Sequence, residues 1–304
     1  MTALAAMQEG ILSPTESLQC TPSFTFFQQT FNNWDPYVDQ PMELGQALAE
    51  SCDTYFYRVG QRFYDLPSSR GATLQLWASR FGFGSATGID LGPENTGLVP
   101  TPDWRCRHFG GPPCAGYIDR IWKPGYEVQL AIGQGDLEVT PIQMARFYAM
   151  IANGGQMVTP HIAEDVESPT DAAGQPNVLR MLATQQPTPS GVDPAALQAV
   201  QQGLWLGTHS VYGTSYGVFG QFPISIAGKT GTAEKDVQLP GYPNPVKLNQ
   251  SWWCGYGPTD NPSIVVCAVI ENGGHGGTAA APAALQVFEA YFKKHGVTTS
   301  HLTD

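Results

Sequence analysis

The sequence predicts a mixed α/β fold of the α+β type, in which helices flank an antiparallel central sheet. Apolar residues at helical spacing dominate the first half of the chain, whereas three strand-like segments follow one another closely near its end, at 222–234, 248–258 and 262–274. The turn-forming run "GPTDNP" separates the last two segments. Short connections of this kind join antiparallel neighbours, so we expect a meander rather than a parallel sheet.

Helices are expected on both sides of these strands. Two helical pieces within 41–63 meet near Ser51, and further helices are predicted at 2–12, 73–84, 140–155, 193–207 and 278–296. Thr140 and Asp193 are suited to cap their helices, because each is followed by proline at the first helical position. The last helix has one apolar stripe and basic residues in its final turn, so it should pack on the sheet.

Composition restricts the class of protein. The chain has 304 residues, 42% of them hydrophobic and only 13% charged, and its formal net charge is −11. This excludes a disordered chain, and without a basic cluster it excludes a nucleic-acid-binding protein. No apolar run approaches the roughly 20 residues that span a bilayer, and the first residues do not have the pattern of a signal peptide.

Six cysteines and six histidines show no spacing typical of a metal site, so no metal and no cofactor is predicted. Cys106 and Cys114 could close a short disulfide loop in "CRHFGGPPC", and free thiols fit the sequence equally well. Cys52 is expected to be buried, with a reactive thiol as the alternative.

Lys229 is the first residue that invites a chemical interpretation. It stands at the end of an apolar strand in "SIAGKTGTAEK", between glycines that allow a ligand's backbone to approach. A cation beside the hydroxyls of Thr230 and Thr232 is suited to hold a carboxylate. The alternative is a lysine on an edge strand whose amine reaches into water.

Ser51 and Asp53 form a second candidate cluster in "ESCDTYFY". They lie two residues apart at a junction between helices, where both side chains can point into one cleft. Serine and aspartate are also common helix caps, and Asp53 ahead of "TYFYRV" fits that simpler role.

Taken together, these motifs resemble those of penicillin-binding proteins and serine β-lactamases, whose joint signature is S-x-x-K, S-D-N and K-T-G. "KTGT" at 229–232 matches the third motif and "SCD" at 51–53 takes the place of the second. Five longer stretches are similar to the transpeptidase domain of class B penicillin-binding proteins: "GIDLGPENTGLVP", "AIGQGDLEVTPIQMARFYAMIANGG", "FPISIAGKTGTAE", "SWWCGYGP" and "GGTAAAPAALQVFEAYF". The form "SCDTYFY" is most similar to the elongation-type PBP2 branch of that class.

The resemblance implies a role for each site residue. In that family a serine attacks the D-Ala-D-Ala bond of a peptidoglycan stem peptide, and an amine of a neighbouring stem accepts the acyl group. Ser51 would relay protons, Asp53 would orient the catalytic lysine of S-x-x-K and the substrate amide, and Lys229 would supply positive potential. The segment Thr230, Gly231 and Thr232 would bind the substrate or a β-lactam, with the Thr232 N–H in the oxyanion hole.

The resemblance also predicts organisation and partners. One transpeptidase domain at 1–304, incomplete at its N-terminus, would contain an all-helical subdomain mainly at 1–155 and a sheet-forming part mainly at 156–304. The full-length protein would work on the outer face of the bacterial cytoplasmic membrane, held by an anchor outside this sequence. Its partners would be stem peptides, β-lactams and a glycosyltransferase of the elongation machinery.

The motif S-x-x-K itself is absent, because no serine stands three residues before any of the six lysines. "TAEK" at 232–235 reads T-x-x-K, which we interpret as coincidence since it lies in a strand. The expectation is a transpeptidase domain that begins just after the nucleophile and is inactive alone. The alternatives are a non-catalytic pseudo-transpeptidase scaffold and a relative of the serine β-lactamases or β-lactam sensors.

Overall fold

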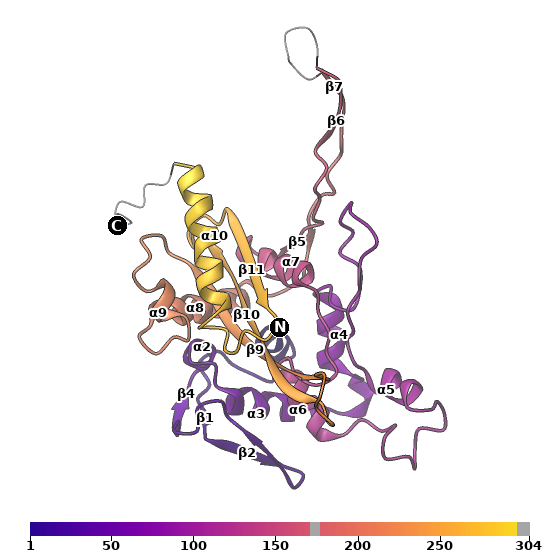
Figure 1. Ribbon diagram of the computed structural model, residues 1–304. Coiled ribbons are helices and arrows are strands. Elements are labelled where there is room, and N and C mark those ends of the chain that lie inside the picture. The colour runs from indigo at the N-terminus through magenta and orange to yellow at the C-terminus, as the bar shows by residue number, and fades with distance from the viewer. Residues whose placement is uncertain (171–176, 297–304) are drawn as a thin grey trace.

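The computed structural model describes residues 1–170 and 177–296 and shows a three-stranded antiparallel sheet covered by helices on both faces (Figure 1). The helices are α1 (Thr2–Gln8), α2 (Leu44–Ala49), α3 (Asp53–Tyr64), the 3-10 helix η1 (Ser68–Arg70), α4 (Thr73–Arg80), α5 (Pro102–His108), α6 (Pro124–Ala131), α7 (Pro141–Ala152), α8 (Pro194–His209), α9 (Tyr216–Phe219) and α10 (Ala280–Lys294).

The strands are β1 (Leu18–Cys20), β2 (Ser23–Phe26), β3 (Gln29–Asn32), β4 (Gln40–Met42), β5 (Gln156–Met157), β6 (Asp165–Ser168), β7 (Asn177–Met181), β8 (Thr188–Pro189), β9 (Ala227–Val237), β10 (Val246–Gly257) and β11 (Ile264–Ile270). The main sheet has the order β11-β10-β9, and the other described strands form two-stranded ladders. The predicted antiparallel meander and the α+β fold are therefore confirmed.

The main sheet separates two apolar cores because successive side chains point to opposite faces. Trp253 is fully buried on one face, where it packs on α10 through Phe288. Cys254 and Tyr256 belong to the larger core on the other face, with residues of α1, α3, α7 and α8. Helix α10 thus covers one face and the helical part of the chain covers the other.

The strand β9 differs from its prediction at both ends. It begins at Ala227 rather than near Phe222, and it continues to Val237. The preceding carbonyls are engaged elsewhere: the Ser225 carbonyl accepts the Thr259 N–H, and the Ile226 carbonyl accepts the Thr208 hydroxyl at 2.6 Å. These contacts take 225–226 out of the ladder.

Local capping explains why several helices lie where the sequence predicts them. The Thr140 hydroxyl accepts the N–H of Gln143, and the Gln143 side chain accepts the N–H of Thr140, which is a complete capping box at the start of α7. The Asp193 carboxylate caps α8 by accepting the N–H groups of Ala195 and Ala196. The predicted junction near Ser51 is also present, between α2 and α3.

Three disulfides cross-link the chain: Cys20–Cys52, Cys106–Cys114 and Cys254–Cys267. The question left open for Cys106 and Cys114 is thereby answered, and Cys52 is buried as predicted but is not a thiol. Within 1–170 and 177–296, the structure has no helix long and apolar enough to cross a membrane.

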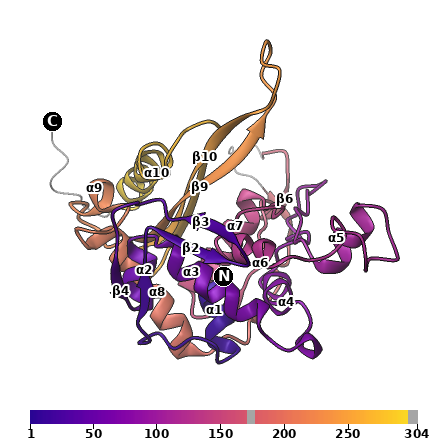
Figure 2. The same cartoon turned by 90° about the horizontal axis from the view of Figure 1, so that it is seen from below.

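Two hairpins project from the body of the molecule. The β6–β7 ladder extends away from α7 in Figure 1 and is almost entirely exposed. The β9–β10 hairpin continues beyond the rest of the sheet, as Figure 2 shows. The second hairpin carries Lys229 near its base, so the sheet itself positions that lysine.

A pair of glycines allows β9 and β10 to approach closely beside Lys229. Gly228 and Gly255 lie directly opposite each other, and the Trp253 ring lies against both. A Cβ on Gly255 would lie only 2.8 Å from the Gly228 Cα. A side chain at either position would therefore push the two strands apart.

We predict that Gly255→Ala destabilises the fold by about 1–3 kcal/mol through overpacking. Urea unfolding of the purified chain measures this change. Gly217→Ala is the control, because a Cβ there meets nothing within 4 Å, and its effect should stay within about 1 kcal/mol of zero. Equal midpoints for Gly255→Ala and the unmodified chain would contradict the prediction.

Candidate active site

The candidate site centres on Lys229, whose amine is held between the sheet and the helical part of the chain. Its Nζ donates to the Ser51 Oγ at 2.7 Å and to the carbonyl of Thr230 at 3.1 Å. The structure therefore brings together two predicted site residues that are 178 positions apart. The alternative of an amine reaching into water is wrong for Lys229.

Ser51 is placed by an unusual backbone conformation at the α2–α3 junction. Its φ is 59°, in the left-handed region that few residues other than glycine adopt. The N–H groups of Ser51 and Cys52 donate to carbonyls of the last turn of α2, those of Leu48 and Ala47. The chain then turns at once into α3, which aims the serine hydroxyl at Lys229.

Asp53 is the first residue of α3 but does not cap it. The cap is Cys52, whose Sγ accepts the N–H of Tyr55. The Asp53 carboxylate instead accepts the N–H of Trp34 at 2.9 Å, and the Asp53 N–H donates to the Asn33 side chain at 2.8 Å. The simpler capping role considered for Asp53 is therefore wrong.

Burial changes the protonation of both charged groups. Desolvation raises the pKa of Asp53 to about 6, against the opposing effects of the Trp34 N–H and the Lys229 charge. Desolvation likewise lowers the pKa of Lys229 to about 8, and the Asp53 charge opposes that change. Between about pH 6 and 8 both groups are ionised and each supports the charge of the other.

Thr230 and Thr232 lie two positions apart on β9, so their side chains share one face of the strand. The Thr230 hydroxyl donates to the Thr214 hydroxyl at 2.7 Å, and the Thr232 hydroxyl accepts the N–H of Gly276 at 3.3 Å. Among the described residues, β9 is an edge strand of the main sheet and pairs with β10 alone. No described strand pairs with the outer edge of 230–232, where the carbonyls of Thr230 and Thr232 accept hydrogen bonds from the side chains of Lys229 and Gln134.

Sequence reasoning missed several side chains that support this site. Gln134 donates to the Thr232 carbonyl at 2.9 Å, and Thr214 links Thr230 to α2 through its own N–H and the Ala49 carbonyl. Trp34 and Asn33, described above, hold Asp53. The run "AIGQGD" is the only sequence signal for Gln134. The sequence around Thr214, Trp34 and Asn33 has no pattern that links these residues to Lys229.

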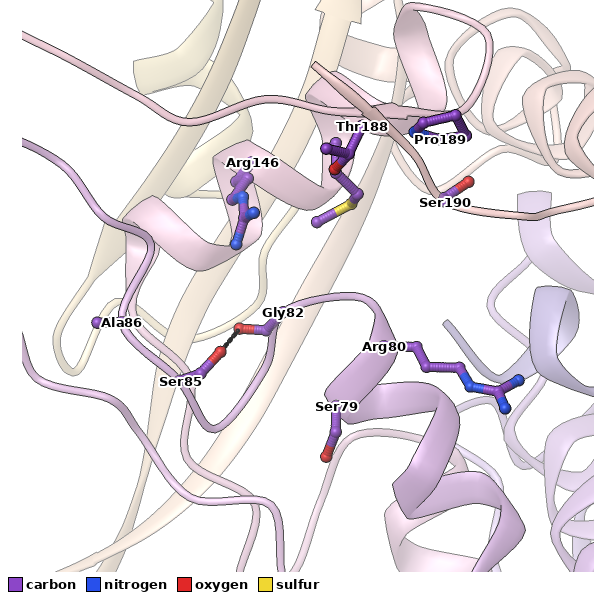
Figure 3. Close-up of a pocket in the computed structure, with 10 residues that line it drawn as sticks. Ser79, Arg80, Gly82, Ser85, Ala86, Arg146, Thr188, Pro189 and Ser190 are labelled. Atoms are coloured by element: carbon purple, nitrogen blue, oxygen red, sulfur yellow. Dashed lines mark hydrogen bonds between the residues drawn. The ribbon is translucent and has the colours of Figure 1, made fainter. Parts of the chain in front are cut away.

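Other features lie apart from the cluster. Lys235, the lysine of "TAEK", is half exposed and pairs with Glu271. A cavity of about 430 Å³ between α4, α7 and the segment after β7 contains none of the predicted site residues (Figure 3). It is lined by Ser79, Arg80, Gly82, Ser85, Ala86, Arg146, Met157, Thr188, Pro189 and Ser190.

Comparison with known protein families identifies the chain. Residues 1–289 match the family model of the penicillin-binding protein transpeptidase domain. The chain belongs to this family. The resemblance inferred from "SCD" and "KTGT" is thereby confirmed, and the fold is that of the penicillin-binding protein transpeptidases.

Individual relatives place the chain among PBP2-type members of the family. It is 29% identical over 301 residues to the peptidoglycan D,D-transpeptidase MrdA of Haemophilus influenzae, covering 96% of this chain and 43% of that protein. The corresponding Salmonella typhimurium protein is 28% identical, with 98% and 46% covered. The chain therefore spans under half the length of these relatives.

A solved structure shows the same similarity. Pseudomonas aeruginosa PBP2, in complex with WCK 5153, superposes with a TM-score of 0.75 and 30% identity, covering 96% of this chain and 59% of that one. The relatives are named peptidoglycan D,D-transpeptidases, and this chain has the transpeptidase fold with Ser51, Asp53 and Lys229 gathered at one place.

We predict that Asp53→Asn lowers the pKa of Lys229 below about 8, because the carboxylate that favours the ammonium form is removed while burial is unchanged. The reciprocal variant Lys229→Met should raise the pKa of Asp53 above about 6. NMR titration of the lysine Nζ and the aspartate carboxyl carbon measures both. Unchanged values in both variants would show that the two charges do not interact.

Proposed function

We propose that this chain is the transpeptidase part of a peptidoglycan D,D-transpeptidase that cross-links stem peptides through a serine acyl-enzyme. The contact of Lys229 with Ser51, beside Asp53 and the edge of β9, is the single observation that carries the proposal. Relatives named peptidoglycan D,D-transpeptidase support it across almost the whole chain.

The edge of β9 suits a substrate that adds as a further strand. An extended stem peptide would pair with 230–232, and its terminal carboxylate would meet the hydroxyls of Thr230 and Thr232 near the Lys229 ammonium. Glycine at 231 leaves room for the peptide backbone. The N–H of Thr232 would then contribute to the oxyanion hole.

In this proposal Ser51 and Asp53 serve proton movement. A nucleophilic serine Oγ bonds to the carbonyl carbon of the D-Ala-D-Ala bond, its proton passes to a neighbouring base, and the departing D-alanine amine takes a proton as the C–N bond breaks. Ser51, hydrogen-bonded to Lys229, is positioned to relay that proton. The acyl group then passes to an amine of a second stem peptide.

The nucleophile of this reaction is not supplied by an S-x-x-K within 1–304. We propose that the chain on its own does not form the acyl-enzyme. The same observation favours a second function, a non-catalytic scaffold of wall synthesis that binds stem peptides without cleaving them. The DNA upstream of Met1 discriminates: an in-frame S-x-x-K supports the enzyme, and a stop codon with a ribosome-binding site supports the scaffold.

We further propose that the full-length protein works outside the cytoplasm with a glycosyltransferase partner of the elongation machinery. Three disulfides are typical of proteins that fold in an oxidising compartment. One structure 32% identical to this chain comes from work on the coordination of polymerization and crosslinking by a peptidoglycan synthase complex. Both observations fit an enzyme that acts on the growing wall.

We predict that the chain binds peptides ending in D-Ala-D-Ala through their free carboxylate. Lys229→Met should weaken binding roughly tenfold or more, because a charge-assisted hydrogen bond is lost. Lys235→Met is the matched control on the same strand and should bind normally.

The affinity for these peptides should also fall above about pH 8, because deprotonation removes the Lys229 charge. NMR titration measures each affinity, and equal binding of the C-terminally amidated peptide would contradict this site.

We predict that fluorescent penicillin does not label the purified chain covalently, since no S-x-x-K serine is available to open the β-lactam ring. Gel fluorescence after denaturation measures the label. A longer form that supplies an upstream S-x-x-K should be labelled, and serine-to-alanine substitution in that motif should abolish the signal. Heat-sensitive labelling of the 304-residue chain would contradict this prediction.

A further inference from the structure

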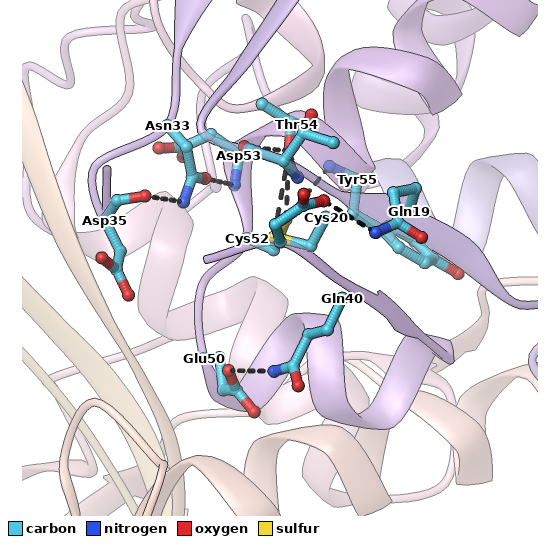
Figure 4. Close-up of a disulfide and its surroundings, with 12 residues drawn as sticks. Gln19, Cys20, Asn33, Asp35, Gln40, Glu50, Cys52, Asp53, Thr54 and Tyr55 are labelled. Atoms are coloured by element: carbon cyan, nitrogen blue, oxygen red, sulfur yellow. Dashed lines mark hydrogen bonds between the residues drawn. A yellow bond between two sulfur atoms is a disulfide. The ribbon is translucent and has the colours of Figure 1, made fainter. Parts of the chain in front are cut away.

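The disulfide between Cys20 and Cys52 lies inside the candidate site rather than beside it. Cys52 is the residue between Ser51 and Asp53, and Cys20 is the last residue of β1. The bond closes a separation of 32 residues, and both sulfurs are buried (Figure 4). The cross-link therefore reaches directly into the segment that carries two site residues.

That segment needs support because its backbone is strained. Ser51 holds a φ of 59°, which costs free energy in any residue with a Cβ and persists only where the surroundings impose it. Cys52 imposes it from one side: its N–H closes the last turn of α2, while its sulfur caps α3. One residue thus fixes the end of one helix, the start of the next and the turn between them.

The far end of the disulfide is also firmly held. Cys20 pairs with Gln40 in the β1–β4 ladder. The next residue, Thr21, exchanges two hydrogen bonds with the Thr54 hydroxyl, at 2.8 and 2.9 Å. The disulfide therefore ties the turn at Cys52 to a segment that is itself anchored on α3.

Space beside the disulfide makes the tie important. Both cysteines line a cavity of about 140 Å³, together with Trp34, Glu50 and Tyr212. A turn next to such a cavity has room to shift once its cross-link is removed. Trp34 holds the Asp53 carboxylate and also donates to the carbonyl of Glu50, the residue before Ser51, so a shift of the turn would disturb both of these contacts.

The other two disulfides do not join a strained turn to a separate segment. Cys254–Cys267 joins directly opposite residues of β10 and β11, and Cys254 also lies opposite Lys229 in the β9–β10 ladder, but the ladders already hold these residues in place. Cys106–Cys114 closes a separation of 8 residues at the end of α5 and borders none of the site residues. Removal of Cys106–Cys114 is consequently a control for the loss of a disulfide away from the site.

We propose that Cys20 and Cys52 are positioning residues, whose disulfide holds Ser51 at the Lys229 amine and Asp53 at the Trp34 N–H. The site is then assembled in the oxidised chain and loosened in the reduced one. The proposal deepens the proposed function of the same cleft, but the arrangement it explains exists whether or not the chain binds a peptide. Its test therefore uses readouts that need no ligand and no acylation.

The test compares the double variants C20S/C52S and C106S/C114S with the unmodified chain. Hydrogen exchange reports on the amides of 51–54, and NMR titration reports on the Asp53 carboxyl and the Lys229 amine. In C20S/C52S we expect at least tenfold faster exchange at 51–54, with the pKa of Asp53 falling from about 6 toward its ordinary 3.8 and that of Lys229 rising from about 8 toward its ordinary 10.5. C106S/C114S should leave all three unchanged.

The result that overturns the proposal is a lower melting temperature in C20S/C52S with unchanged exchange and titration at the site, which would mean that the disulfide only stabilises the fold. Should that variant fail to fold, the unmodified chain is titrated with a phosphine reductant. Alkylation and mass spectrometry then measure how much of Cys20 and Cys52 is reduced to thiols. As these thiols form, hydrogen exchange at the amides of 51–54 must become faster. Thiols without faster exchange refute the proposal. Failure of the unmodified chain to bind a D-Ala-D-Ala peptide would count against the function alone.

Discussion

The hydrogen bond from Lys229 to Ser51 is the contact on which the rest of the site depends. It joins the sheet to the helical part of the chain across 178 positions of sequence. A partly buried ammonium is costly unless polar groups replace its water. The Ser51 hydroxyl, the Thr230 carbonyl and the Asp53 charge supply that replacement. These contacts are therefore the conditions for a stable charged lysine at position 229.

Meeting those conditions places constraints on both parts of the molecule. On the sheet side, facing glycines at 228 and 255 allow β9 and β10 to close under the Trp253 ring. On the helical side, Ser51 adopts a left-handed backbone between two helices. Neither feature is favourable in isolation, and each persists because neighbouring packing or hydrogen bonds impose it.

The parts that could be predicted from the sequence are those encoded within a few residues. The start of α7 follows from Thr140, Pro141 and Gln143, which complete their capping contacts without help from elsewhere. The residues of "SCD" and "KTGT" were found because their spacing resembles a known family. The start of β9 was misplaced because Thr208 and Thr259, distant in sequence, decide it.

The supporting residues were beyond sequence reasoning for the same reason. Gln134 and Thr214 reach β9 across separations of 98 and 16 residues, and no local pattern encodes such contacts. The partner of Cys52 was equally hidden, since six cysteines allow about 15 complete pairings. Non-local geometry, rather than residue type, selects all three.

The charges at the site limit what a ligand's own charge could contribute to the proposed binding. With Asp53 and Lys229 both ionised between about pH 6 and 8, the pair carries no net charge. A bound carboxylate would therefore gain little from the overall field of a chain whose net charge is −11. Its binding would have to come from donors aimed at its oxygens, and in the proposed function the Lys229 ammonium and the Thr232 hydroxyl are such donors. The Asp53 charge favours the ammonium form of Lys229, so it supports that donor without adding net charge to the site.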